Sequence, residues 1–179
     1  VDIASGADHL VILEKNGKVY TIGCGEQGQL GRASLRTLTG ESRRGTKTLL
    51  TPGMIIKKAK SFIANAIWAS TYCTFLREEK TGDVYGFGLN NYHQITTKKS
   101  KNEFEHFPLL TKLKNVKDIA GGSHHTVIMT NDKKIYSIGR KDYGRLGLGS
   151  LKDDVTELTE IVELRDKGIV SISCGAENS

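Results

Sequence analysis

Short apolar runs separated by glycine-containing turns recur along the chain, and this pattern predicts β-strands rather than helices. Residues 10–13 (LVIL) and 19–22 (VYTI) are apolar runs joined through Lys15-Asn16-Gly17. An Asn-Gly pair between two apolar runs is a strong signal for a β-hairpin. Segments 81–83 (TGD) and 131–133 (NDK) take the same place in later copies of the pattern. Residues 154–164 come nearest to an amphipathic helix, but their Thr and Val content leaves helix and strand both open.

The pattern is an internal repeat. Stretches 2–32, 66–96 and 118–149 align, and a fourth copy begins at Gly168. Several short strands per copy, at spacings of roughly 50 to 65 residues, are typical of propeller blades rather than helical solenoids. The sequence therefore predicts an all-β fold, a β-propeller forming a single partial domain, with repeats at approximately 1–60, 61–115 and 116–167 and the start of the next at 168–179. The register is marked by one tyrosine per copy and by a glycine three residues later: Tyr20, Tyr85 and Tyr136, with Gly23, Gly88 and Gly139.

Composition and charge refine this picture without changing it. The 179 residues include 20 glycines and only two prolines, which suits many tight turns, and no apolar run is long enough to cross a membrane. The net charge of +6 is concentrated in segments 33–60 and 96–117, between the patterned stretches. This placement suits attraction to a polyanion or to an acidic protein surface, and equally a solvated surface. Three cysteines without paired spacing argue against a disulfide framework or a zinc site and favour a reducing compartment, and no metal or other cofactor is expected.

Two motifs suggest chemistry that the repeat explains better. Residues 23–28 match Gly-x-Gly-x-x-Gly, but Gln29-Leu30-Gly31 follows where a dinucleotide site needs a helix, so a turn is the better interpretation. Cys73 takes the position that His9 and His125 hold in the other copies. Equivalent positions in a repeat usually serve packing, so we expect these three side chains to be structural rather than catalytic.

Positions that differ between copies are the informative ones for function. The residue before the repeat histidine is Asp8 in the first copy, Tyr72 in the second and His124 in the third. No common structural need selects an acid, a phenol and an imidazole at one place. Since equivalent positions lie at the same end of their blades, these side chains predict a binding face.

The motifs also carry a family resemblance that covers essentially the whole chain. Gly-x-x-His, Val-Tyr-x-x-Gly and Gly-Gln-Leu-Gly are similar to the repeat of the regulator of chromosome condensation, and YTIGCGEQGQLGR, YGFGLNNYHQ, GGSHHTVIM and YGRLGLG resemble successive blades of that family. Such relatives are seven-bladed propellers. The resemblance thus implies that this chain supplies about three blades and the beginning of a fourth. An open propeller exposes unpaired strand edges, so we expect the natural protein to be longer at both ends and this segment not to fold stably alone.

The resemblance further implies a function without covalent chemistry. It implies a guanine-nucleotide exchange factor for the small GTPase Ran, bound to chromatin in the nucleus and acting in nucleocytoplasmic transport and the cell cycle. Matching positions imply contacts with Ran or a role in exchange for Asp8, Arg32, Asn91, His93 and His124. Ile95-Thr96 departs from the usual Leu-Gly, so the turn after Gln94 is expected to differ in shape.

The resemblance implies a second contact, with chromatin, through the long first-blade insertion from Ala33 to Lys60. Family members use a basic loop here to enter the acidic patch of the nucleosome, and Arg suits that task because it pairs bidentately with carboxylates. Arg43, Arg44 and Lys47 are the residues that match. Nucleosomes, and DNA with them, are therefore expected partners beside Ran, whereas no membrane and no small-molecule substrate are expected.

Two rival interpretations stay open. One is a non-catalytic protein- or chromatin-binding propeller module in a larger protein such as a ubiquitin ligase. The other is an enzyme that uses the glycine-rich turn or a cysteine. The first would be distinguished by the domains that flank the segment, and the second by covalent labelling of Cys24 that tracks with loss of function.

Overall fold

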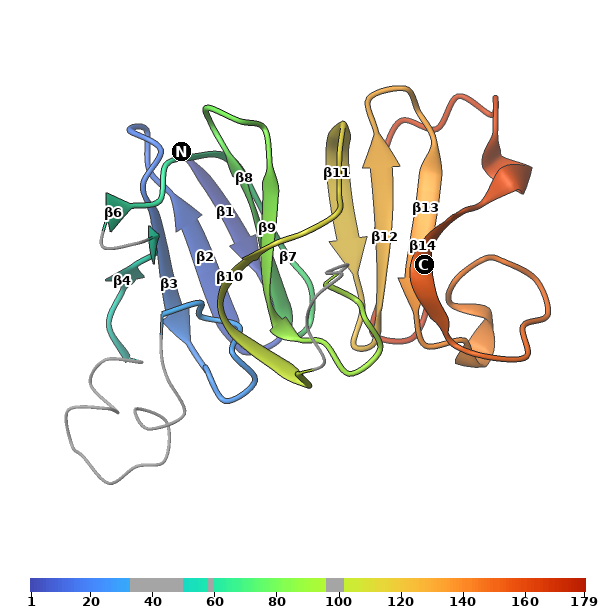
Figure 1. Ribbon diagram of the computed structural model, residues 1–179, viewed down its shortest axis with the longest axis horizontal. Coiled ribbons are helices and arrows are strands. Elements are labelled where there is room, and N and C mark those ends of the chain that lie inside the picture. Colours follow the sequence, from blue (N-terminus) through green and yellow to red (C-terminus); the bar gives the residue numbers. More distant parts are fainter. Residues whose placement is uncertain (33–49, 58–59, 96–101) are drawn as a thin grey trace.

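Three four-stranded antiparallel sheets stand side by side in the computed structural model (Figure 1). The structure describes residues 1–32, 50–57, 60–95 and 102–179. The first sheet contains β1 (Asp2–Ser5), β2 (His9–Leu13), β3 (Val19–Gly23) and β4 (Gly53–Met54). The second contains β7 (Ala64–Ala69), β8 (Cys73–Glu78), β9 (Val84–Leu89) and β10 (Phe104–Leu110). The third contains β11 (Val116–Gly121), β12 (His125–Thr130), β13 (Ile135–Gly139) and β14 (Val155–Glu160).

Each sheet is a simple meander in which consecutive strands pair. The β2–β3 hairpin turns at Asn16-Gly17, where Gly17 has φ of 80° and Asn16 Oδ1 accepts the N–H of Lys18 at 3.0 Å. Between the first and second sheets, β5 (Ile56–Lys57) pairs with β6 (Lys60–Ser61). A 3-10 helix, η2, spans Val162–Leu164 after the third sheet. Segment 154–164 therefore contains an edge strand and one 3-10 turn. The all-β propeller architecture predicted from the repeat is confirmed, and the chain forms part of such a propeller.

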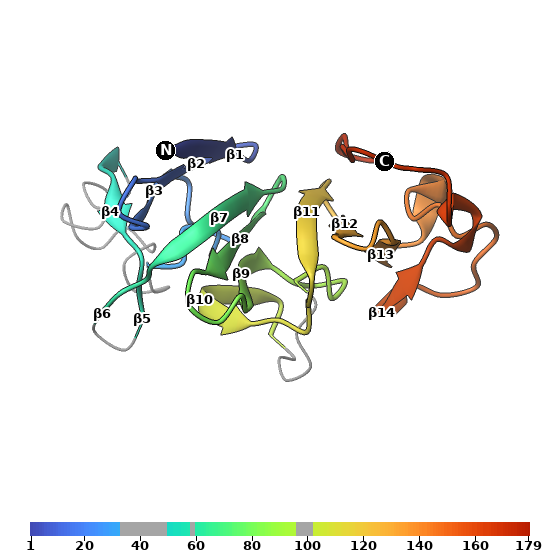
Figure 2. The same ribbon diagram turned by 90° about the horizontal axis from the view of Figure 1, so that it is seen from above.

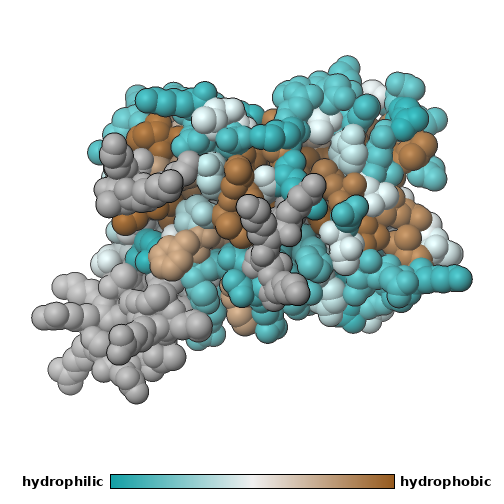
Figure 3. Space-filling view, viewed as in Figure 1, coloured by the Kyte–Doolittle hydropathy of each residue, from teal (hydrophilic) through white to brown (hydrophobic). Residues whose placement is uncertain are grey.

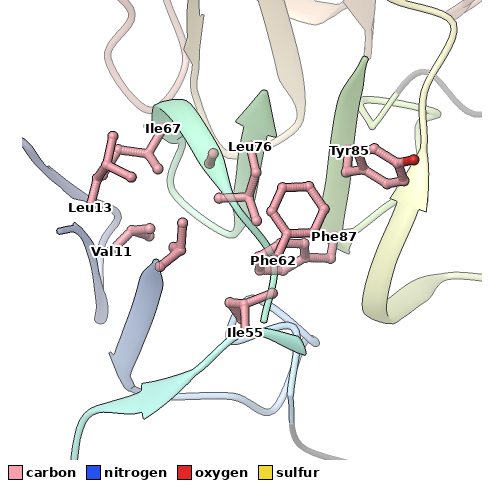
Figure 4. Packing of buried hydrophobic residues seen from close by; sticks show 10 residues of the cluster. Val11, Leu13, Ile55, Phe62, Ile67, Leu76, Tyr85 and Phe87 are labelled. Carbon is pink, nitrogen blue, oxygen red and sulfur yellow. The ribbon is translucent and has the colours of Figure 1, made fainter. Parts of the chain in front are cut away.

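The blades pack through their inner strands and through apolar clusters between neighbouring sheets. Strand β7 contacts both β1 and β11, and the view from above shows the three blades side by side (Figure 2). A first cluster unites Val11 and Leu13 of the first blade with Leu76 and Phe87 of the second, as the close-up shows (Figure 4). A second cluster joins the second blade to the third, and a third joins the third blade to residues 161–174. Each blade thus completes its core with its neighbour.

This shared packing accounts for the burial of β9 and β12 along their whole length, whereas β2 of the first blade alternates. Every residue of β12 is buried, whereas every residue of the edge strand β14 is partly or fully exposed. A strand in a blade that is covered by neighbours on both faces buries the side chains of both faces, so its sequence is a continuous apolar run. The space-filling view shows apolar residues gathered across the middle of the molecule and polar residues along the two ends of the blades (Figure 3).

Polar side chains also tie the second blade to the third. Trp68 donates its indole N–H to Asp118 Oδ1 at 2.9 Å, and Arg77 donates to the carbonyl of Val116 at 2.9 Å. The Arg77 guanidinium lies 5.7 Å from the centre of the Trp68 ring, within cation–π range. In the described part of the chain, no helix is long and apolar enough to span a membrane.

Candidate functional site

The turns between the first and second strands of the blades share one backbone connection. The carbonyls of Asp8, Tyr72 and His124 accept N–H groups from Cys24, Leu89 and Arg140 at 2.8, 3.1 and 2.9 Å. Because this connection repeats, the three side chains start from equivalent backbone positions at one end of the blades. The structure therefore brings Asp8, Tyr72 and His124 to one face, which we call the turn face.

Glycine is required at the end of each third strand for this connection to form. Gly23, Gly88 and Gly139 have φ of 115°, 117° and 129°, which side chains rarely adopt. A Cβ at these positions would lie 2.3, 2.2 and 2.3 Å from the carbonyl oxygens of the turn residues. The repeated Tyr-x-x-Gly motif is thus a steric requirement of the turn face.

The structure adds a fourth residue, Glu177, to this set. The N–H of Ala7 bonds to Thr71 O at 3.1 Å, and that of Ser123 bonds to Ala176 O at 2.9 Å, so 175–177 continues the series of turns. Glu177 then lies where the earlier copies have Asp8, Tyr72 and His124. Sequence reasoning missed it because Asn178 replaces the repeat histidine, although Cys-Gly-Ala-Glu-Asn stands at the right distance after Ile172.

His124 lies in a group of aromatic and charged side chains between the second and third blades. Its ring meets Tyr92 edge to face at 5.3 Å, and the Arg140 guanidinium lies 5.6 Å from the Tyr92 ring. Arg140 also pairs with Asp142 at 2.6 Å. Partial burial, and then the nearby Arg140 charge, lower the pKa of His124 from its ordinary value. His124 is therefore a neutral hydrogen-bonding group at neutral pH.

Asn91 and His93 flank Tyr92 in the loop after β9. The Asn91 side chain is exposed and accepts from Gln94 Nε2 at 3.1 Å. His93 has φ of 59°, and its N–H bonds to the carbonyl of Asn90 at 3.1 Å. The structure thus places Asn91 and His93 beside Tyr92, which itself contacts His124 across the blade junction, while Asp8 lies on the first blade.

Arg32 lies differently from the other predicted contact residues. Its guanidinium donates to Thr21 Oγ1 and Thr21 O at 3.1 Å each and to Thr51 O at 3.0 Å. Burial lowers its pKa from the ordinary value. Arg32 therefore holds the chain before β4 against β3, and a contact with a partner stays a prediction. The predicted chromatin-binding residues lie outside the described residues: Arg43, Arg44 and Lys47.

Behind the turn face, the repeat histidines form relays between blades. His9 Nε2 lies 2.9 Å from Thr74 Oγ1, and the Thr74 hydroxyl donates to Gln29 O at 2.8 Å. Since the hydroxyl has one proton, His9 Nε2 is the donor in the first contact. His125, Ser179 and the carbonyl of Arg145 repeat this relay at 2.9 and 2.6 Å.

Both histidines are structural, as the repeat predicts. Burial lowers the pKa of His9 and of His125 to about 4, so both rings are neutral near neutral pH. Burial also raises the pKa of the Cys73 thiol to about 12, which leaves it unreactive as a nucleophile. The glycine-rich segment forms successive turns, closed by Gly28 N–H to Gly25 O and Gly31 N–H to Gly28 O at 3.0 Å each.

The turn face therefore offers carboxylate, phenol and imidazole groups on a repeated backbone. Within the described ranges, no three His, Cys, Asp or Glu side chains gather as metal ligands would. A set of varied polar and aromatic side chains on a repeated backbone is suited to binding another macromolecule.

Sequence comparison supports the repeat assignment. The Regulator of chromosome condensation (RCC1) repeat matches residues 16–48, 81–129 and 132–179. The Regulator of chromosome condensation of Drosophila melanogaster is 53% identical over 174 residues, which are 97% of this chain and 31% of that protein. The Xenopus laevis protein of the same name is 42% identical over 185 residues, covering 100% of this chain and 43% of that protein. This chain thus spans less than half the length of these relatives.

Two further matches bear on fold and on the rival interpretation. The crystal structure of Prp20p from Saccharomyces cerevisiae, whose description includes binding to Gsp1p and histones, superposes with a TM-score of 0.79 at 24% identity, over 98% of this chain and 41% of that chain. The human E3 ubiquitin-protein ligase HERC2 is 31% identical over 191 residues, covering 100% of this chain and 4% of that protein. The first match establishes the fold, and the second indicates that the repeat also occurs in much larger proteins.

Proposed function

Because the chain belongs to the Regulator of chromosome condensation (RCC1) repeat family, we propose that it forms part of a guanine-nucleotide exchange factor for the small GTPase Ran. Its relatives of that name are 42% and 53% identical over nearly the whole chain, well above the 31% of the ubiquitin ligase. The Prp20p structure, described with its binding to Gsp1p and histones, supports a GTPase and histones as partners. We propose the nucleus, in association with chromatin, as its location.

The observation that carries the proposal is the contrast between the backbone and the side chains of the turn face. The backbone connections repeat with nearly constant hydrogen-bond lengths, whereas the side chains are Asp8, Tyr72, His124 and Glu177. Packing alone would favour one residue type at equivalent positions. A different group at each blade is what a single asymmetric partner requires, because each blade meets a different part of it.

Exchange on this face would proceed by linkage, without bond formation. A protein that binds the nucleotide-free GTPase more tightly than the loaded form weakens nucleotide binding by the same factor. Asp8 is exposed and would pair with a basic group of the GTPase or disfavour the bound phosphate. His124, neutral and in edge-to-face contact with Tyr92, would add a directed hydrogen bond.

Chromatin attachment is the second part of the proposal and rests on the resemblance of the first-blade loop. Arg43, Arg44 and Lys47 would pair with carboxylates of the nucleosome acidic patch. Attachment would confine exchange to chromosomes and make GTP-loaded Ran abundant near them. Loss of nucleosome binding in an Arg43→Ala, Arg44→Ala double variant, with GDP release from free Ran unchanged, would support this assignment.

The decisive experiment is the release of labelled GDP from Ran by the full-length protein that contains this chain. We expect fast release by the wild type and slower release by the Asp8→Ala and His124→Ala variants, with unfolding temperatures unchanged for Asp8→Ala. The matched control is Lys15→Ala, at the hairpin end of the first blade, which should leave release unaffected. Release no faster than the spontaneous rate would remove the exchange proposal.

A second candidate function is a non-catalytic protein-binding module, which the similarity to HERC2 along the whole chain favours. It predicts that the full-length protein binds a partner without accelerating GDP release. The same assay separates the two, since only an exchange factor accelerates release at substoichiometric concentration.

A further inference from the structure

Gln94 is a buried glutamine in the loop that follows β9, with only 1% of its surface exposed. Its Oε1 accepts the N–H of Tyr92 at 2.8 Å, and its Nε2 donates to Asn91 Oδ1 at 3.1 Å. Its main-chain carbonyl accepts the hydroxyl of Thr126, on the third blade, at 2.8 Å. Gln94 is therefore fixed by its main chain and its side chain together, and its side chain is bonded to two residues of the loop.

The direction of each side-chain bond follows from the main chain. The N–H of Tyr92 can only donate, so the atom of the Gln94 amide that faces it is the oxygen. The NH2 group of the same amide is then the one that faces Asn91, and the Asn91 atom that receives it is Oδ1. The main chain at Tyr92 thus sets the amide orientation of Gln94 and, through it, that of Asn91.

Asn91 consequently turns its own NH2 group away from Gln94. Asn91 is exposed, and within the residues that the structure describes its Nδ2 forms no hydrogen bond. The loop starts after Leu89, whose N–H bonds to Tyr72 O, so it lies at the same end of the blade as the turn face. The second blade has a neighbour on each side, so the exposure of Asn91 is that of a blade packed on both faces.

The equivalent positions in the other two blades carry carboxylates, Glu26 and Asp142. An ionised carboxylate has acceptors and no donor, and Asp142 is paired with Arg140 at 2.6 Å. An aspartate in the second blade would accept the bond from Gln94 Nε2 as well as an asparagine does. The inward bond therefore does not require an amide at this position, whereas an outward donor does.

We infer that Gln94 is a positioning residue that holds the Asn91 amide with its NH2 group toward the bound GTPase, and that the GTPase places an acceptor oxygen against it. This inference rests on the proposed exchange function. The oxygen belongs to a carboxylate or to a main-chain carbonyl, since both accept from an amide NH2 group. A donor that is already oriented loses less conformational entropy on binding than a freely rotating one.

The first test measures GDP release from Ran at varied Ran·GDP concentration, using the full-length protein and its Asn91 variants. Asn91→Asp keeps the acceptor for Gln94 Nε2 but turns a negative charge toward the GTPase oxygen. We expect it to raise KM roughly 10- to 100-fold at an unchanged unfolding temperature, and Asn91→Ala, which removes the donor without adding a charge, to raise KM roughly 5-fold. The matched control is Asn16→Asp at the hairpin end of the first blade, where Asn16 Oδ1 also accepts an N–H, and KM should not change.

The salt dependence of the Asn91→Asp effect identifies the oxygen. An increase in KM that shrinks at higher salt concentration assigns a carboxylate, because salt screens repulsion between two charges. An increase that does not depend on salt assigns a main-chain carbonyl.

The second test addresses Gln94 itself through a double-mutant cycle with Asn91→Ala. Gln94→Met removes both side-chain bonds with little change in volume. We expect it to raise KM several-fold in the wild type and to have little effect in the Asn91→Ala background, because Gln94 acts through Asn91. Gln29→Met is the matched structural control, since it removes the equivalent bond to the Gln27 N–H and should lower the unfolding temperature similarly without raising KM. Release is measured below the unfolding transition of every variant.

The outcomes separate this inference from the function beneath it. Fast wild-type release with an Asn91→Asp KM that is unchanged or lowered would mean that no acceptor faces Asn91, and would overturn the inference while leaving the exchange function intact. Equal effects of Gln94→Met in both backgrounds, or an equal rise in KM for Gln29→Met, would overturn the positioning role of Gln94. If the wild-type protein does not accelerate GDP release at all, the proposed function fails and the inference fails with it.

Discussion

The first and second blades fill the same position behind the turn face with different pairs of residues. In the first blade, His9 packs against Gly6, where an added Cβ would lie 2.2 Å from His9 Cε1. In the second blade, Cys73 and Ser70 occupy these positions, and Ser70 Oγ accepts the Cys73 N–H at 3.1 Å. The third blade again combines a glycine with a histidine: a Cβ added at Gly122 would lie 2.4 Å from His125 Cε1. The large imidazole ring is thus paired with a glycine, whereas the small cysteine side chain is paired with a serine.

This comparison teaches that the repeat conserves a volume rather than a residue. The backbone bonds are the same in both cases, since Gly6 N–H bonds to His9 O and Ser70 N–H to Cys73 O at 2.9 Å each. The relay acceptor is also present in each neighbouring blade, as Thr74 beside the first and Thr126 beside the second. The two blades differ only in how the space between these fixed parts is filled.

The largest effect is expected when the second blade's serine is placed in the first blade. Gly6→Ser would bring a Cβ within 2.2 Å of His9 Cε1 and 2.5 Å of the carbonyl oxygen of Ser70. Overpacking against both a ring and a backbone atom should lower the free energy of unfolding by about 3 kcal/mol or more. Urea unfolding of the full-length protein measures it. Gly82→Ala, at φ of 70° with open space around it, is the control and should cost only about 1 kcal/mol, from the strain of a Cβ in the left-handed backbone region.

A somewhat smaller effect should follow from placing the first blade's histidine in the second. Cys73 is fully buried, so Cys73→His alone should destabilise by about 2–3 kcal/mol. Adding Ser70→Gly makes room for the ring, and Thr126 supplies the acceptor, so the double variant should recover most of this loss. Additive effects of Cys73→His and Ser70→Gly in the same unfolding assay would contradict the idea of a conserved volume.

Acid should destabilise the blades that contain histidine. His9 and His125 have pKa values of about 4 in the fold, below the ordinary 6.5, so the unfolded chain binds more protons between these values. Their contribution is therefore complete above about pH 6.5 and is lost as pH falls toward 4, by on the order of 1–3 kcal/mol per ring. Thermal unfolding between pH 7 and 4 measures this loss. A His9→Gln variant should show a shallower pH dependence, and an identical dependence would assign the loss to other groups.

The smallest effect on stability is expected at the turn face itself. Asp8 is exposed, and its carbonyl rather than its carboxylate makes the repeated bond to Cys24 N–H. Asp8→Ala should change the free energy of unfolding by less than about 0.5 kcal/mol, although it is predicted to slow GDP release. Equilibrium unfolding measured beside the release assay checks both statements. A large loss of stability would mean that Asp8 serves the blade rather than a partner.

The sequence predicted the architecture well because the relevant signals are local. The Asn16-Gly17 turn, the Tyr-x-x-Gly strands and the spacing of the copies each reflect short-range chain geometry, and repetition reinforced them. The same repetition identified Asp8 and His124 as positions that depart from a common pattern. It also predicted correctly that His9 and His125 are structural, since their equivalence implied an equivalent environment.

The contacts across blade junctions could not be predicted in the same way. Nothing local to Tyr92 indicates its contact with His124, which lies 32 positions later, and nothing local to Arg32 indicates its bonds to Thr21 and Thr51. Gln29 accepts the Gln27 N–H through Oε1, whereas Arg145 at the equivalent position donates to the carbonyl of Asp142, and this difference is visible only in three dimensions. Long-range partners of this kind depend on how neighbouring sheets approach.

By itself, the sequence determined the blades, because strand periodicity and turn chemistry act over a few residues and recur in every copy. It also determined which positions vary at the turn face. Only the tertiary structure decided that Glu177 joins that face and that Arg32 is held by its own blade. These outcomes depend on the packing of one blade against the next, where burial and hydrogen bonding connect residues that are distant along the chain.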